Sequence, residues 1–226
     1  MSKYIVLSEK EWHIDLFNNL RTIFLNDDWI LITTKIEFIL DELVKIRPDK
    51  IFIPHWSYII PSSIYSKYDC IVFHMTDLPY GRGGSPLQNL IVRGHKTTKI
   101  SALKVSDGID TGDIYIKKSL SLDGTARDIL ISATPIIEEM IVEIINHKLV
   151  PVPQKGEVVE FRRRKPDDGN IINLSNIQDI YDFIRMLDCD GYPNAFIETD
   201  SIKLEFFNAN LLSENNLTAN VRISKK

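Results

Sequence analysis

The chain has 226 residues and lacks the features that mark several specialised classes of protein. Its two cysteines, Cys70 and Cys189, lie far apart, which excludes a cysteine-only zinc site and predicts two reduced thiols. No apolar run is long enough to span a bilayer, and the first residues lack the apolar core of a secretory signal. We therefore expect a cytoplasmic protein with no membrane partner and no bound metal.

Signatures of nucleotide and nucleic-acid binding are also missing. No G-x-G-x-x-G follows the first predicted strand, and no G-x-x-x-x-G-K-[ST] occurs, so neither a dinucleotide site nor a P-loop is indicated. The net charge is −4 and there is no basic tail, which argues against a nucleic-acid partner. The remaining composition, 44% hydrophobic and 26% charged, is typical of an ordinary globular protein.

Strands and helices alternate along the first two thirds of the chain. Capping-box patterns at Ser8–Glu11 and Thr34–Glu37 predict the starts of two helices. This alternation predicts an α/β fold with a mostly parallel sheet and crossover helices. Strands are expected at Tyr4–Leu7, Trp29–Thr33, Lys50–Pro54, Cys70–Met75, Thr97–Val105 and Ile114–Leu122, and further helices at Ser85–Gly94 and Thr125–His147.

A change of composition predicts a second, smaller unit. The segment Pro151–Gly156 contains two prolines and a glycine, which is typical of a linker. We therefore expect a domain at residues 1–150, and a linker with a small α+β unit at residues 151–226. The small unit is predicted to contain a helix near Ile177–Leu187 and strands at Ala195–Ile197, Ile202–Phe206 and Ala219–Ile223.

The stretch Phe73–Ile91 carries the densest chemical signal. His74 lies at the carboxyl end of a predicted strand, where open α/β sheets hold their ligands. A glycine-rich turn with Arg82 and a helix start at Ser85 come next along the chain, and both favour an anion. A lone histidine is usually a packing residue, but this neighbourhood favours a functional role for His74.

A second stretch, Ser106–Ile114, holds Asp107, Asp110 and Asp113. Three carboxylates in a turn are compatible with a solvated turn or a calcium loop, although the terminal bidentate Glu of an EF-hand is missing. Alternatively, one carboxylate orients and charge-stabilises His74.

Several ordered motifs together resemble the folate-dependent formyltransferases, most closely the sugar N-formyltransferases. The resemblance covers roughly Lys50 to Gln154, and the segments Phe161–Gly169 and Tyr181–Phe196 are similar to the region after the catalytic domain in that group. It rests on His74-x-x-x-Leu78-Pro79-x-x-Arg82-Gly83-x-x-Pro86, on Gly94 before Thr97 and Thr98, and on Asp110-x-Gly112-x-Ile114. The resemblance implies a Rossmann-like catalytic domain and transfer of a formyl group from 10-formyl-tetrahydrofolate to an amine.

The resemblance also implies roles for individual residues. His74 and Asp110 match the catalytic His and Asp of the family. The folate is expected against main-chain atoms of two loops, at Leu78, Pro79, Tyr80, Ser106 and Gly108. Val72 stands where the family has an Asn that helps to hold the formyl oxygen. Candidates to replace that Asn are Asn89, His55 or His74 itself.

For the acceptor, we expect a nucleotide-linked amino sugar used in surface glycan (O-antigen-type lipopolysaccharide) synthesis. The corresponding substrate-binding candidates are Arg82, Gly83, Arg163 and Tyr192, with Phe196 either beside Tyr192 in a base-stacking platform or in the core. The run Arg162–Lys165 is equally compatible with a solvated charged stretch. Alternatives are a catalytically altered folate or nucleotide-sugar binding module, and a formyltransferase acting on methionyl-tRNA or a carrier-linked amino acid. The apolar C-terminal third offers a face for a homodimer.

Overall fold

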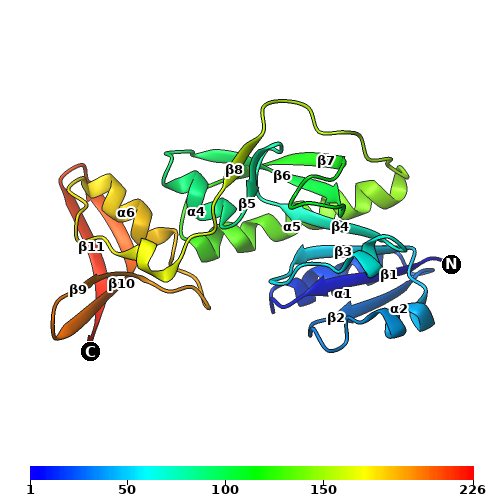
Figure 1. Ribbon diagram of the computed structural model, residues 1–226, viewed down its shortest axis with the longest axis horizontal. Helices are drawn as coiled ribbons and strands as arrows, with labels where there is room; N and C mark the ends of the chain where they lie inside the picture. Colours follow the sequence, from blue (N-terminus) through cyan, green and yellow to red (C-terminus); the bar gives the residue numbers. More distant parts are fainter. The chain divides into compact units, whose positions relative to one another are not determined.

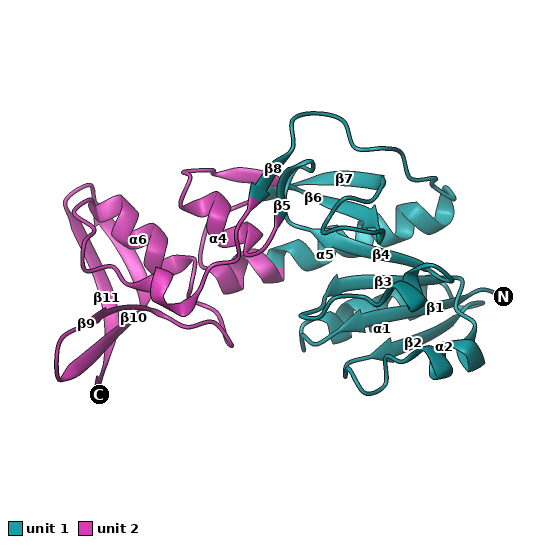
Figure 2. Cartoon of the chain, in the orientation of Figure 1, with its two compact units in different colours: residues 1–82, 99–120, 132–160 teal, residues 83–98, 121–131, 161–226 magenta.

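The computed structural model describes residues 1–226 (Figure 1). The chain divides into two compact units (Figure 2). Unit 1 comprises residues 1–82, 99–120 and 132–160, and unit 2 comprises residues 83–98, 121–131 and 161–226. The strands are β1 (Lys3–Ser8), β2 (Asp28–Ile32), β3 (Lys50–His55), β4 (Asp69–His74), β5 (Tyr80–Gly83), β6 (Thr97–Lys104), β7 (Ile114–Ser121), β8 (Val159–Phe161), β9 (Ala195–Glu198), β10 (Ile202–Ser213) and β11 (Asn216–Lys225). The helices are α1 (His13–Ile23), α2 (Leu40–Ile46), α3 (Ser62–Tyr65), α4 (Pro86–Ile91), α5 (Ala126–Asn146) and α6 (Ile177–Arg185), with a 3₁₀ turn, η1 (Pro166–Gly169).

A six-stranded sheet with the order β2-β1-β3-β4-β6-β7 organises unit 1. The pairs among β1 to β4 are parallel, and β6 runs antiparallel to β4. This confirms the predicted Rossmann-like α/β fold with a mainly parallel sheet. Because parallel strands end at the same edge, the carboxyl ends of β1, β3 and β4 meet there, at Ser8, His55 and His74.

The two faces of the sheet are buried by alternate residues of each strand, as the period of two requires. On one face Ile5, Ile51 and Leu43 of α2 belong to one apolar cluster. The neighbouring residues Tyr4 and Phe52 point to the other face. There they contact Trp29, with their ring centroids 4.8 and 6.2 Å from that of Trp29. Burial on both faces explains the near-continuous apolar runs of the strands.

Both predicted capping boxes are wrong as helix starts. The Ser8 hydroxyl accepts a hydrogen bond from the Lys10 amide and contacts Nδ1 of His13 at 2.6 Å, and α1 begins only at His13. In the second pattern Thr34 does bond Glu37, but the bond joins the two side chains, and α2 begins at Leu40. Neither pattern therefore caps a helix, because the Ser8 hydroxyl binds a backbone amide ahead of α1 and Thr34 binds the side chain of Glu37.

Unit 2 contains a three-stranded antiparallel sheet, β11-β10-β9, together with α4 and α6. The three predicted strands are confirmed, but β10 and β11 are longer than expected. The division into units differs from the expected boundary at residue 150. Residues 83–98 join unit 2 because Gly83 and Gly84 lie so close to Phe161 and Arg163 that a Cβ at either glycine would overlap them.

No helix of the protein combines the length and the apolar character needed to cross a membrane.

The buried His13 and the partly buried His55 predict how the free energy of unfolding depends on pH. Burial, together with the charge of Lys10, lowers the pKa of His13 to about 3 and that of His55 to about 4. In the unfolded chain both histidines have a pKa of about 6.5. Below that pH the unfolded state therefore binds more protons than the folded state, in which both histidines stay neutral. We expect the free energy of unfolding to fall as the pH drops below about 6.5, by up to about 1.4 kcal/mol per pH unit for each histidine.

Urea unfolding across this pH range measures the effect. His13→Asn should flatten the slope, whereas His147→Asn, at an exposed position, should leave it unchanged. A slope that is the same in the parent and in His13→Asn would show that His13 is not buried in the neutral form.

Candidate functional site

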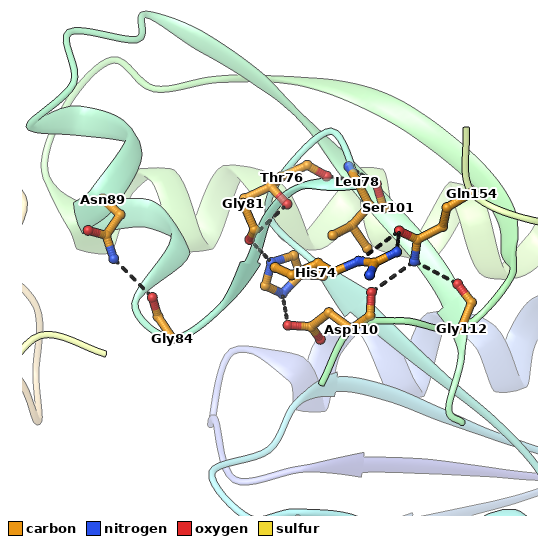
Figure 3. Close-up of polar contacts among 11 residues, drawn as sticks. His74, Thr76, Leu78, Gly81, Gly84, Asn89, Ser101, Asp110, Gly112 and Gln154 are labelled. Carbon is orange, nitrogen blue, oxygen red and sulfur yellow. Dashed lines mark hydrogen bonds and ion pairs between the residues drawn. The ribbon is translucent and has the colours of Figure 1, made fainter. Parts of the chain in front are cut away.

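His74 occupies the end of β4 with both ring nitrogens facing acceptors (Figure 3). Nε2 lies 2.8 Å from the Gly81 carbonyl, and Nδ1 lies 3.5 Å from Oδ2 of Asp110. Only 9% of the His74 side chain and 17% of the Asp110 side chain are exposed. An imidazolium donates to both partners at once, whereas a neutral ring donates to only one. The structure thus brings together the two residues predicted to be catalytic.

The loop after His74 is held by buried hydrogen bonds. The Ser101 hydroxyl donates to the Thr76 carbonyl at 2.7 Å and accepts from the Leu78 amide at 3.3 Å, and Ser101 and Thr76 are fully buried. Lys117 bonds the Asp77 carboxylate and the Leu78 carbonyl. Two loop positions expected to face folate, Leu78 and Pro79, are therefore carried on a braced backbone.

The charge of Asp77 supports the same loop. Burial raises the pKa of this carboxyl, but hydrogen bonds and charge from Lys117 and Lys99 outweigh burial and leave the pKa below its ordinary value. Asp77 therefore stays ionised at neutral pH and keeps both lysines beside the loop.

The loop that presents Asp110 has an unusual backbone. Asp110 itself has a φ of 54°, in the left-handed region that few non-glycine residues adopt. The Thr111 hydroxyl donates to the Asp107 carbonyl at 2.6 Å and contacts the Ser106 hydroxyl at 3.1 Å. A Cβ at Gly112 would overlap the Lys104 carbonyl, so only glycine fits there. Tight local packing holds Asp110 in its strained conformation.

Gln154 was not predicted as a site residue, yet its side chain contacts this loop. Its amide nitrogen donates to the carbonyls of Asp110 and Gly112 at 2.8 and 2.7 Å (Figure 3). Its oxygen accepts two hydrogen bonds from Arg82. The segment predicted as a linker is therefore structured, and Val152 pairs with Ile114 through two backbone hydrogen bonds. The composition of Pro151–Gly156 hid this, because a single glutamine in a loop carries no periodic signal.

Val72 leaves the site without the side-chain donor that the family pattern has. It packs with the buried side chains of Leu78, Leu103 and Ile114. Asn89, the first candidate to replace it, donates to the carbonyls of Gly84, Ser85 and Arg162 within unit 2. Its two amide hydrogens are already shared among these carbonyls, so the geometry does not support Asn89 as an oxyanion donor.

The other predicted replacement, His55, ends β3 and is neutral at neutral pH, because burial lowers its pKa to about 4. A neutral imidazole is a weaker donor to an anion than an imidazolium. Of the three candidates, His74 is the one that faces Asp110.

The residues predicted to bind the acceptor have different surroundings. Arg82 is bonded to Gln154, and Gly83 adjoins Phe161. Arg163 is exposed on unit 2 beside Gly84. Phe196 is 6% exposed, and the Lys203 ammonium lies over its ring in a cation–π contact. Phe196 therefore belongs to the core and not to a stacking platform. Burial raises the pKa of Tyr192, whose hydroxyl bonds Gln88.

No cluster of three or more His, Cys, Asp or Glu side chains is arranged to hold a metal ion.

Comparison with known proteins identifies relatives of both parts of the chain. The family model for formyl transferases matches residues 34–128, and the model for the C-terminal domain of methionyl-tRNA formyltransferase matches residues 166–224. A solved methionyl-tRNA formyltransferase from Clostridium thermocellum is 44% identical, with a TM-score of 0.96 and complete coverage of both chains. The methionyl-tRNA formyltransferase of Thermodesulfovibrio yellowstonii is 27% identical over 175 residues, which are 72% of this chain and 56% of that protein. The chain thus spans less than two thirds of the curated relatives it matches, 56% and 59% of the first two.

More distant solved structures share the fold. HypX from Aquifex aeolicus in complex with tetrahydrofolic acid is 16% identical, with a TM-score of 0.74 over 91% of this chain and 37% of that chain. A sugar N-formyltransferase from Shewanella is 15% identical, with a TM-score of 0.68 over 88% of this chain and 94% of that chain.

The expectation of a nucleotide-linked amino-sugar acceptor is wrong. The likeness to methionyl-tRNA formyltransferase reaches 44% identity over the whole chain, whereas the likeness to sugar N-formyltransferases stays at the level of the fold. The motifs at His74 and Asp110 could not separate the two groups, because the part of the reaction they share is formyl transfer and not acceptor recognition. Because the amino-sugar acceptor is not supported, the expected role in surface glycan synthesis is not supported either.

Proposed function

Since the chain belongs to the formyltransferase family, we propose that it transfers the formyl group of 10-formyl-tetrahydrofolate to the amine of methionyl-tRNA. The observation that carries the proposal is the full-length match to a methionyl-tRNA formyltransferase at 44% identity. The paired His74 and Asp110 at the carboxyl edge of the sheet support the same reaction.

The pair supplies the charge stabilisation that acyl transfer needs. A neutral amine attacks the formyl carbon, a C–N bond forms, and negative charge develops on the formyl oxygen. Collapse of this tetrahedral intermediate breaks the bond between the formyl carbon and N10 of the folate. The attacking nitrogen gives up one proton, N10 takes one up, and tetrahydrofolate leaves. An imidazolium at His74 would donate its Nε2 hydrogen to that oxygen in exchange for the Gly81 carbonyl, and Asp110 at Nδ1 would stabilise the imidazolium. Since Val72 offers no side-chain donor, His74 carries this hydrogen bond without help from that position.

The co-substrate would be held by loops that the structure keeps rigid. Folate supplies a formyl group that is activated for transfer to an amine. Main-chain atoms of Leu78, Pro79 and Tyr80 on one side, and of Ser106 and Gly108 on the other, would hold it. These two loops flank His74 and Asp110, so the residues present fit a ligand that delivers its formyl group at His74.

A tRNA acceptor replaces the expectation that the chain has no nucleic-acid partner. The net charge of −4 describes the whole surface and hides local groups. Arg162, Arg163 and Lys165 are exposed on one short segment of unit 2, where they can meet backbone phosphates. The reduced folate remains the second partner, and the homodimer and the cytoplasmic location stay predictions.

An acceptor-competition assay tests the proposed function. The chain is incubated with 10-formyl-tetrahydrofolate and an equimolar mixture of methionyl-tRNA and a nucleotide-linked amino sugar, and mass spectrometry locates the formyl group. We expect it on the α-amine of methionine. Formyl found on the sugar alone, or on neither amine, would contradict the proposal.

A further inference from the structure

The side-chain amide of Gln154 uses all of its hydrogen-bonding capacity within the site. Its two hydrogens go to the carbonyls of Asp110 and Gly112, and its oxygen accepts from Nε and Nη2 of Arg82 at 3.2 and 2.8 Å. A side-chain amide has two donors and two acceptor lone pairs, and each is engaged. Figure 3 shows Gln154 directed at the loop that carries Asp110.

The backbone around Gln154 is fixed as well. Val152 and Ile114 exchange two backbone hydrogen bonds, of 2.8 and 2.9 Å, which attach the segment to the first residue of β7. Pro153 then limits the backbone between Val152 and Gln154. The amide therefore approaches the loop from an anchored position.

One of the two carbonyls that Gln154 binds belongs to Asp110 itself. Asp110 has a left-handed φ of 54°, which costs energy for a residue with a Cβ and persists only where neighbours enforce it. Gln154 bonds the loop on this residue and again two residues later, at Gly112. These two bonds hold the backbone from which the Asp110 carboxylate reaches His74.

We propose that Gln154 is a positioning residue, which holds Asp110 against His74 by binding the carbonyls of Asp110 and Gly112. The inference rests on the proposed function, because it assigns Gln154 a part in formyl transfer. The same amide holds Arg82, so one side chain sets both the Asp110 loop and a guanidinium of the site.

Gln154→Glu tests the bonds to the two loop carbonyls separately from the bonds to Arg82. The carboxylate has almost the same shape and remains an acceptor for Arg82, with charge assistance. It cannot donate to the two carbonyls and repels both. We expect kcat for methionyl-tRNA formylation to fall roughly 10- to 100-fold, since small misplacements of catalytic groups have effects of this order. The KM for folate should change little.

Two readouts separate positioning from a general loss of stability. In an Asp110→Asn background, Gln154→Glu should cost no more than about 2-fold, because Gln154 acts through Asp110. Hydrogen exchange of the backbone amides at residues 107–113 should accelerate in Gln154→Glu. The matched control is Gln178→Glu, which replaces an amide that donates to Asp182 at 3.0 Å in unit 2 and should leave that exchange unchanged.

Unchanged exchange at residues 107–113 in Gln154→Glu would overturn the inference, as would a loss of kcat that multiplies with that of Asp110→Asn. If the parent chain formylates no methionyl-tRNA, the proposed function fails, and the exchange experiment still decides whether Gln154 holds the loop.

Discussion

His74→Ala is expected to lower the rate of methionyl-tRNA formylation by at least about 100-fold. The variant removes the ring that lies 3.5 Å from the Asp110 carboxylate and 2.8 Å from the Gly81 carbonyl, and with it the donor to the developing oxyanion. Asp110→Asn should cost a similar factor, because a neutral amide no longer stabilises the imidazolium. Single-turnover kinetics with saturating folate measure both effects.

The two losses should not multiply. Asp110 acts on the reaction through His74, so the double variant should be about as slow as His74→Ala alone. Circular dichroism and the melting temperature serve as controls that the sheet is intact. Turnover near the parental rate in either single variant would remove that residue from the mechanism.

Arg185→Met is expected to have the largest effect on stability: it should lower the free energy of unfolding by about 3 to 5 kcal/mol. Arg185 is 4% exposed, and its guanidinium bonds the Asp182 carboxylate at 2.6 Å and the carbonyls of Leu122 and Gly124 at 2.6 and 2.9 Å. Methionine fills similar space but leaves Asp182, itself 6% exposed, as an uncompensated buried charge. Urea denaturation measures the change.

The matched control is Arg127→Met, which also breaks an arginine–aspartate pair of unit 2. Arg127 and Asp190 keep 51% and 82% of their side chains exposed, so this pair should contribute no more than about 1 kcal/mol. Equal destabilisation by the two variants would show that the Arg185–Asp182 pair is not buried as described.

The sequence predicted the fold well because periodic apolar patterns determine it. The strands β1, β3 and β4 and the long helix α5 all lie within a few residues of their predicted positions. Helix starts were predicted less well, since the Ser8 hydroxyl contacts the His13 ring and Thr34 bonds the side chain of Glu37. The two compact units also divide the chain differently from the expected boundary at residue 150, because close contacts of Gly83 and Gly84 with Phe161 and Arg163 join segments distant in sequence.

For the site, sequence motifs predicted His74 and Asp110, which the structure places together. They did not predict Gln154, whose importance comes from two carbonyls more than 40 residues away in the sequence. They also led to the wrong acceptor, because the motifs at His74 and Asp110 do not separate the methionyl-tRNA formyltransferases from the sugar N-formyltransferases. Asn89 looked available from the sequence but is held by backbone carbonyls of its own unit.

The most direct test of the central claim is the rate at which N-formylmethionyl-tRNA accumulates with the parent chain and with His74→Ala, at equal protein concentration and saturating 10-formyl-tetrahydrofolate. The account predicts formation of this product by the parent and a rate at least about 100-fold lower with the variant. No N-formylmethionyl-tRNA with the parent, or equal rates for the two proteins, would contradict it.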